Sequence, residues 1–252
     1  MQNTNGGDIL GLFQEGGKKM KTIGLIGGMS WESTTTYYQI INETVKEVLG
    51  GLHSAKCILY SVDFDEIEVC QAKGDWQKSG EILSDAAKAL ERAGADFIVI
   101  CTNTMHKVAP EIQAATALPI LHIAEMTAQA LKKQDITKVG LLGTKYTMQQ
   151  DFYKQVIKAH DIEVVVPDEQ DMLEINRIIY EELCKGEIKE ASRKTYLEVM
   201  EKLKAQGAQG IILGCTEIGL LVKQMDTSIP LFDTTIIHAK SAAMQAIYDT
   251  IE

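Results

Sequence analysis

Short runs of apolar residues recur along the chain, and amphipathic segments separate them. The runs are rich in β-branched residues and do not alternate with polar ones, as expected for strands covered on both faces of a sheet. In the segments between them, apolar residues recur at helical spacing. Strands are expected at 22–28, 57–62, 97–101, 118–123, 138–144, 164–167, 211–213 and 229–233. Helices are expected at 30–49, 80–93, 103–115, 124–133, 148–159, 170–184, 190–206 and 237–248, and 64–73 is helical or irregular.

The same pattern is repeated in the second half of the chain. Residues 138–144 (KVGLLGT) resemble 21–27 (KTIGLIG), and a Gly-Ala pair precedes both the strand before Thr102 and the strand before Cys215. The separation from the glycine that ends the first strand of each half is 75 residues for Thr102 and 72 for Cys215. This self-similarity predicts two similar α/β halves, each with a parallel sheet and right-handed crossovers.

The repeat predicts two Rossmann-like domains related by a pseudo-two-fold axis. The first is expected to comprise 20–118 with 230–252, and the second 119–229. Residues 1–19 are rich in glycine and are expected to form a disordered extension rather than a secretory signal. If the halves face each other, the strand ends that carry Thr102 and Cys215 would meet across one cleft, where small-molecule sites are common.

Composition narrows the function classes. The net charge of −10 and the pI of about 5.1 make nucleic acid and anionic membranes poor partners. No apolar run approaches the roughly 20 residues that span a bilayer. The five cysteines are widely spaced and form no metal-like cluster with histidine, so the sequence predicts no metal and a reducing, cytoplasmic compartment.

Cys215 stands at the carboxyl end of a buried strand, just before the next helix. Ligands bind at such strand ends in open α/β sheets, and a helix start lowers the pKa of a nearby thiol. Thr102 holds the equivalent position in the first half. Proton-bearing groups on opposite sides of one carbon suit racemisation of an amino acid without a cofactor. Asn103, Thr104 and Thr216 are adjacent donors for a substrate carboxylate.

These motifs resemble the aspartate racemase family, within the aspartate/glutamate/hydantoin racemase superfamily. The resemblance extends over residues 21–252 and implies two Rossmann-like domains. It also implies acidic amino acid substrates, no pyridoxal phosphate, no metal and a homodimer. The motifs that carry it are IGLIGGMSWEST at 23–34, SVDF at 61–64, CTNTMH at 101–106, LLGT at 141–144 and GCTE at 214–217.

The chain departs from the family at one catalytic position. The family's first cysteine directly precedes an Asn-Thr pair, and here that position is Thr102, with Cys101 one residue early. A shift of one residue near a strand end turns a side chain to the other face, so Cys101 is not expected to substitute. We expect Cys215 to act on the L-enantiomer, as the resemblance implies, and Thr102 to act less efficiently on the opposite face.

The resemblance also points to residues that bind the substrate's side-chain carboxylate. Gln71 matches one such position, whereas the expected basic residue of the second half aligns with Glu174, and Arg177 lies one turn on. The choice between aspartate and glutamate therefore stays open. The predicted substrate-binding residues are Met29, Gln71, Asn103, Thr104, Thr216 and Glu217.

Two other functions remain open at this point. Relatives that keep only the second cysteine include decarboxylases of malonate-type acids, which would use Cys215 alone. A non-catalytic amino acid-binding protein would need no nucleophile. A cell-wall glutamate racemase is disfavoured, because the first strand lacks that branch's Asp-Ser-Gly motif.

Overall fold

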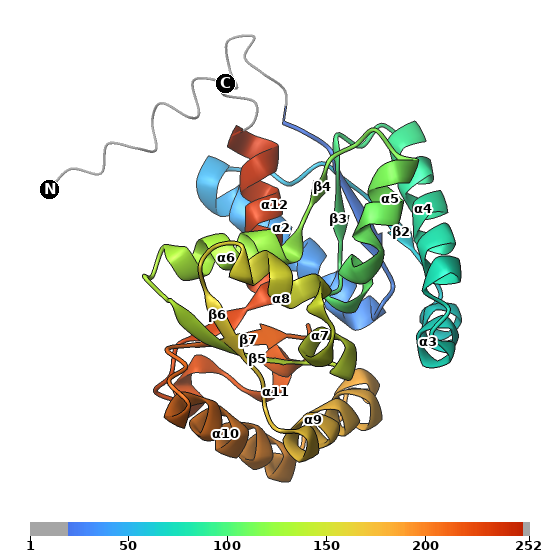
Figure 1. The fold of residues 1–252 in the computed structure, drawn as a ribbon. Helices are drawn as coiled ribbons and strands as arrows, with labels where there is room; N and C mark the ends of the chain where they lie inside the picture. Colours follow the sequence, from blue (N-terminus) through green and yellow to red (C-terminus); the bar gives the residue numbers. More distant parts are fainter. Residues whose placement is uncertain (1–19, 249–252) are drawn as a thin grey trace, which may run out of the picture. The chain divides into compact units, whose positions relative to one another are not determined.

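The computed structural model describes residues 20–248, which form two compact units, each built on a four-stranded parallel sheet (Figure 1). Unit 1 contains the described residues up to Cys101, 108–121 and those from Ala239 onward. Unit 2 contains 102–107 and 122–238. The predicted extension at 1–19 lies outside the described residues. The predicted α/β class with two parallel sheets is confirmed.

Unit 1 has the strand order β2-β1-β3-β4. The strands are β1 (Ile23–Gly27), β2 (Cys57–Ser61), β3 (Phe97–Ile100) and β4 (Ile120–Leu121). The helices are α2 (Trp31–Leu49), α3 (Phe64–Lys73), α4 (Trp76–Arg92) and α5 (Ala109–Ala115), and the last helix of the chain, α12 (Thr234–Tyr248), contributes from Ala239 onward.

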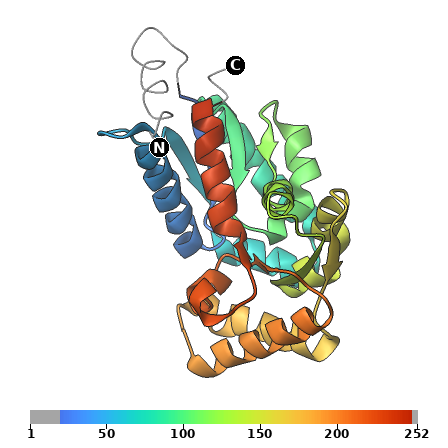
Figure 2. The same ribbon diagram turned by 90° about the vertical axis from the view of Figure 1, so that its left-hand side faces the viewer.

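The central strands of unit 1 are apolar throughout because helices cover both of their faces. Ile23 and Leu25 of β1 alternate toward a cluster with residues of α2 and the alanine-rich side of α12. Figure 2 shows α12 running beside the strands of this unit. On the other face, α4 packs against β1. Ser30 caps α2, since its hydroxyl accepts a hydrogen bond from the backbone N–H of Ser33 (3.3 Å).

Unit 2 repeats this topology, with the strand order β6-β5-β7-β8. The strands are β5 (Lys138–Gly143), β6 (Glu163–Val165), β7 (Ile211–Gly214) and β8 (Leu231–Asp233). The helices are α6 (Ile123–Lys132), α7 (Lys145–Gln149), α8 (Asp151–Lys158), α9 (Glu169–Glu181), α10 (Glu190–Ala205) and α11 (Ile218–Leu221). Short 3₁₀ helices are η1 (Thr104–Val108), η2 (Leu183–Lys185) and η3 (Gln224–Asp226).

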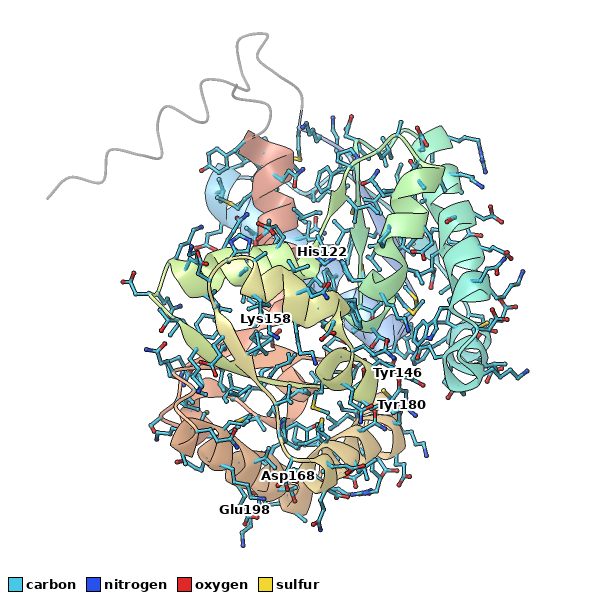
Figure 3. All side chains as sticks on the ribbon, viewed as in Figure 1. His122, Tyr146, Lys158, Asp168, Tyr180 and Glu198 are labelled. Carbon is cyan, nitrogen blue, oxygen red and sulfur yellow. The ribbon has the colours of Figure 1, made fainter. Side chains whose placement is uncertain are left out.

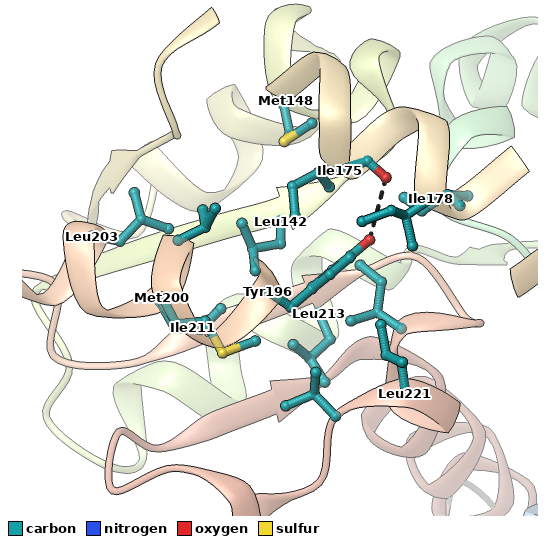
Figure 4. Close-up of a cluster of buried hydrophobic side chains, with 14 of the residues drawn as sticks. Leu142, Met148, Ile175, Ile178, Tyr196, Met200, Leu203, Ile211, Leu213 and Leu221 are labelled. Atoms are coloured by element: carbon teal, nitrogen blue, oxygen red, sulfur yellow. Dashed lines mark hydrogen bonds between the residues drawn. The ribbon is translucent and has the colours of Figure 1, made fainter. Parts of the chain in front are cut away.

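Alternate residues of the central strands of unit 2 fill two separate cores. Leu141 packs with α6 and α8, whereas Leu142 faces α9 and α10. The second core is centred on Tyr196, whose hydroxyl donates to the carbonyl of Ile175 (3.3 Å, Figure 4). This strand order places the switch point between β5 and β7, the edge where ligands bind in doubly wound sheets.

Several boundaries differ from those the sequence predicts. The helix expected at 148–159 is two helices, because Gln150 has extended backbone between them. The helix expected at 103–115 begins as η1, and residues 64–73 are helical. The expected division assigns 230–252 to the first half, whereas β8 pairs with β7 and belongs to unit 2. Residues 102–107 also group with unit 2.

Candidate active site

Cys215 lies directly after β7 and shares a tight turn with a buried carboxylate. Its sulfur donates a hydrogen bond to Oε2 of Glu217 at 3.0 Å, and the Thr216 hydroxyl donates to the same oxygen at 2.7 Å. Glu217 is 4% exposed, whereas Cys215 is partly exposed. The turn therefore holds a partly exposed thiol against a buried hydrogen-bond acceptor.

The electrostatics of this turn contradict the expectation of an activated thiol. Burial raises the pKa of Cys215 well above its ordinary value, and the negative charge of Glu217 raises it further. The helix that follows, α11, has only four residues, so its dipole supplies little compensation. The resting thiol is consequently protonated at neutral pH, with the Glu217 carboxylate as its hydrogen-bond acceptor.

The ends of β5 and β7 approach each other closely beside this turn. Gly143 and Gly214 are partners in the sheet register, and a Cβ on Gly143 would lie 2.8 Å from the carbonyl oxygen of Gly214. Any larger residue would force the strands apart. The two glycines thus allow the segments that begin at Thr144 and Cys215 to leave neighbouring strands at the switch point.

Thr102 follows β3 and is partly exposed. Its carbonyl oxygen lies 2.8 Å from Nδ1 of His106, whereas its hydroxyl has no hydrogen-bond partner among the described residues. Cys101 is fully buried in the core of unit 1, and its sulfur donates to the carbonyl of Val99. Burial raises the pKa of Cys101 far above the usual range. Only Thr102 of this pair presents a group to solvent.

A chain of hydrogen bonds ties the turn after Thr102 to β7. The amide nitrogen of Asn103 donates to the hydroxyl of Thr234 (3.0 Å), which donates to the carbonyl of Leu213 (2.8 Å). Leu213 lies two residues before Cys215. The structure thus links the segments that follow Thr102 and precede Cys215 through one buried hydroxyl. Thr234 could not be singled out from the sequence, since a threonine after a strand carries no distinguishing pattern.

Thr104 makes the second link within unit 2. Its hydroxyl lies 3.1 Å from that of Thr144, which caps α7 and lies 3.3 Å from the hydroxyl of Thr147. Thr104 is therefore engaged with the β5 end of the switch point. Asn103 keeps one unused acceptor, because its buried Oδ1 has no hydrogen-bond partner in the described part of the chain. A buried unpaired carbonyl oxygen is costly, so this atom suits a donor on a bound molecule.

The remaining predicted binding residues lie in unit 1. Met29 follows β1 and is 3% exposed, and Gln71 lies in the last turn of α3 and is 5% exposed.

The Arg177 guanidinium is committed to protein carboxylates, since it bonds Glu174 at 2.7 and 2.9 Å and Glu182 at 3.0 Å. The bond from Arg177 holds the pKa of Glu174 below its ordinary value.

Lys145 is a cation that the sequence analysis did not single out. It is the first residue of α7, directly after Thr144, and its backbone N–H donates to the side chain of Asn176. Its ammonium lies over the ring of Tyr146, 5.0 Å from the centroid, and pairs with no carboxylate among the described residues. Figure 3 labels Tyr146 on α7. Lys145 thus places a positive charge just after the end of β5, at the switch point, with no carboxylate partner in residues 20–248.

Comparison with known proteins places this arrangement in a family. The model of the family described as Asp/Glu/Hydantoin racemase matches residues 26–242. The chain belongs to the Asp/Glu/hydantoin racemase family. It is accordingly an isomerase of the amino acid racemase type.

Solved structures and a curated relative support this assignment. The racemase is 62% identical to a candidate Asp/Glu racemase from Yersinia pestis, with a TM-score of 0.85 over 90% of this chain and 99% of that one. An aspartate racemase homologue from Pyrococcus horikoshii is 38% identical, with a TM-score of 0.79 over the same shares. A broad-specificity amino-acid racemase of Bacillus subtilis is 26% identical over 87% of this chain and 95% of its own length.

The described part of the racemase, residues 20–248, contains no group of three or more histidine, cysteine or acidic residues arranged to hold a metal ion. No helix in this part of the chain is both long and apolar enough to cross a bilayer.

Proposed function

We propose that this racemase interconverts the enantiomers of aspartate, glutamate or both, by cofactor-independent proton transfer at Cα. Cys215 would be the base and acid on one face of the substrate and Thr102 the group on the other. The observation that carries the proposal is the hydrogen bond from the Cys215 thiol to the buried carboxylate of Glu217.

The thiol–carboxylate pair supports a stepwise removal of the substrate proton. Glu217 accepts the thiol proton, and the resulting thiolate then takes the proton from Cα, so that a carbanion forms and the thiol is restored. The Thr102 hydroxyl delivers a proton to the opposite face, which completes inversion. Thr102 regains a proton from solvent, to which it is partly exposed, and Glu217 gives up the proton that it took from the thiol, so that the enzyme returns to its starting state. A bound ammonium group near the pair would favour the thiolate by its positive charge.

Thr102 would make proton transfer unequal at the two faces of the substrate, because a threonine hydroxyl is a far weaker acid than a thiol. The resemblance to the family implies that Cys215 serves the L-enantiomer, so we propose that L-substrates are preferred. The enantiomers have equal free energies in solution, which forces kcat/KM to be equal in the two directions. A preference for the L-form would therefore appear in kcat and KM separately, and in exchange without inversion.

The polar groups around these residues would bind the α-carbon substituents. The unpaired Oδ1 of Asn103 would accept from the substrate ammonium, and Thr104 and Thr216 would donate to its α-carboxylate. For the side-chain carboxylate, Lys145 is the candidate cation, because Arg177 is already neutralised. Met29 and Gln71 stay proposed contacts of the same substrate. A cytoplasmic homodimer stays a prediction from the sequence.

Conversion of L-aspartate and L-glutamate to their D-forms, followed by chiral chromatography without added cofactor, tests the proposal. Wild-type protein should reach a racemic mixture, and Cys215→Ala should lose at least about a hundredfold in rate. Cys184→Ala is the matched control, since Cys184 is a partly exposed cysteine that packs on the same core. No D-product from either substrate would refute the proposal. Release of carbon dioxide from malonate-type acids would instead favour the single-cysteine decarboxylase.

A further inference from the structure

His106 is a buried histidine one helical turn after Thr102, and both of its ring nitrogens make hydrogen bonds to the backbone. It is 2% exposed within η1. Nδ1 lies 2.8 Å from the carbonyl oxygen of Thr102, and the backbone N–H of Ile123 donates to Nε2 at 3.1 Å. The ring therefore bridges the turn after β3 and the first turn of α6.

These partners determine the protonation state of the ring. A carbonyl oxygen can only accept, so Nδ1 must carry a proton, and a backbone N–H can only donate, so Nε2 must be bare. His106 is thus neutral, in the Nδ1–H form. Protonation of Nε2 would leave the Ile123 N–H without its hydrogen-bond acceptor. It would also place two N–H donors, that of Ile123 and that of the ring, against each other in a buried contact.

The groups packed against His106 favour the neutral ring. The centroid of the His122 ring lies 4.6 Å away and that of His238 5.8 Å away, both in edge-to-face contact. His122 accepts a hydrogen bond from Ala124 N–H, and its pKa is lowered by burial, an effect that the charge of Glu125 opposes. A second cation among these imidazoles would be repelled, so the cluster preserves the acceptor on His106.

We propose that His106 is a positioning residue for the racemisation reaction, an inference that rests on the proposed function. By binding the carbonyl of Thr102, the neutral ring fixes the turn that carries the Thr102 hydroxyl and the Asn103 side chain. The Thr102 hydroxyl has no hydrogen-bond partner within residues 20–248, so the backbone holds its orientation. Ile123 N–H in turn holds the ring, which makes α6 the rigid support of this turn.

Two variants separate this role from a purely structural one. In His106→Asn the side-chain amide can take the place of Nδ1 and still donate to Thr102, whereas in His106→Leu it cannot. Both variants remove Nε2, the hydrogen-bond acceptor of the Ile123 N–H, so both should lose the same folding stability from that change. His160→Asn is the matched control, because His160 pairs with the partly exposed Glu125.

The experiment combines steady-state kinetics with nitrogen NMR of histidine-labelled wild-type protein. We expect NMR to find His106 with a protonated Nδ1 and a bare Nε2 at pH 7. His106→Leu should lose about a hundredfold in kcat, the loss that a misplacement of about 1 Å can cause, with a much smaller change in KM. His106→Asn should recover most of that loss, and His160→Asn should match wild type.

Equal kcat values for His106→Asn and His106→Leu, or an Nε2-protonated ring, would overturn the inference. Those results differ from a failure of the proposed function, which would appear as inactive wild-type protein with every aspartate and glutamate enantiomer.

Discussion

Replacement of Glu217 by glutamine should make the Cys215 thiol react faster with an alkylating reagent and should make racemisation slower. The carboxylate oxygen lies 3.0 Å from the sulfur. Two unit charges at that separation repel by about 1.4 kcal/mol at the dielectric constant of water and about 5.5 kcal/mol at an effective value of 20. One pKa unit corresponds to about 1.4 kcal/mol, and Glu217→Gln should lower the pKa of the thiol because it removes this repulsion.

A lower pKa increases the thiolate fraction but weakens each thiolate as a nucleophile. The two effects together should accelerate alkylation about threefold for each unit by which the pKa of the thiol falls. We therefore expect iodoacetamide at pH 8 to modify Cys215 of Glu217→Gln between about threefold and a hundredfold faster than wild type. Mass spectrometry of the peptide that contains Cys215 separates it from the other four cysteines. Racemisation should instead fall by about 10²–10⁴-fold, because the proton acceptor is lost.

Glu198→Gln supplies the control for charge alone, since Glu198 is an exposed residue of α10 (Figure 3). It should leave both rates unchanged. Alkylation of Cys215 that is unchanged or slower in Glu217→Gln would refute the reasoning, because Glu217 would then not oppose the thiolate.

Three further predictions concern specificity and stability. Lys145→Met should raise KM for aspartate and glutamate by about tenfold or more in steady-state assays, since it removes the proposed partner of the side-chain carboxylate; an unchanged KM would exclude that role. Tyr196→Phe should lower the free energy of unfolding in urea by about 0.5–1.5 kcal/mol, because it removes the buried bond to Ile175; no loss would contradict that bond. Burial lowers the pKa of His122, so the unfolded chain takes up its proton first as the pH falls. Stability should decline below about pH 6.5, and this decline should be smaller in His122→Gln; an equal decline would contradict it.

The fold could be predicted from the sequence because its signals are local and repeated. Buried parallel strands appear as uninterrupted apolar runs, and the two halves repeat them in the same order. The short strands and the breaks in helices were harder to predict from the sequence. Gln150 separates two helices through its backbone conformation alone, and neighbouring residues keep helical periodicity across it.

The candidate site was predictable only in part. Cys215 and Thr102 could be found from equivalent positions in the repeat, yet the pKa direction of Cys215 could not. That direction depends on where the Glu217 carboxylate lies, and a sequence neighbour can turn toward the sulfur or away from it. Thr234 and Lys145 depend on contacts with distant parts of the chain, and no spacing in the sequence encodes those contacts.

Deuterium incorporation at Cα tests the central claim most directly, because it separates proton removal from inversion. In deuterated water without added cofactor, proton NMR should detect exchange and inversion of L-aspartate or L-glutamate by wild-type protein. Thr102→Ala should retain exchange into the L-substrate while D-product falls sharply, and Cys215→Ala should lose both. Equal loss of exchange in the two variants, or exchange that survives in Cys215→Ala, would contradict the assignment of Cys215 as the base that acts on the L-enantiomer.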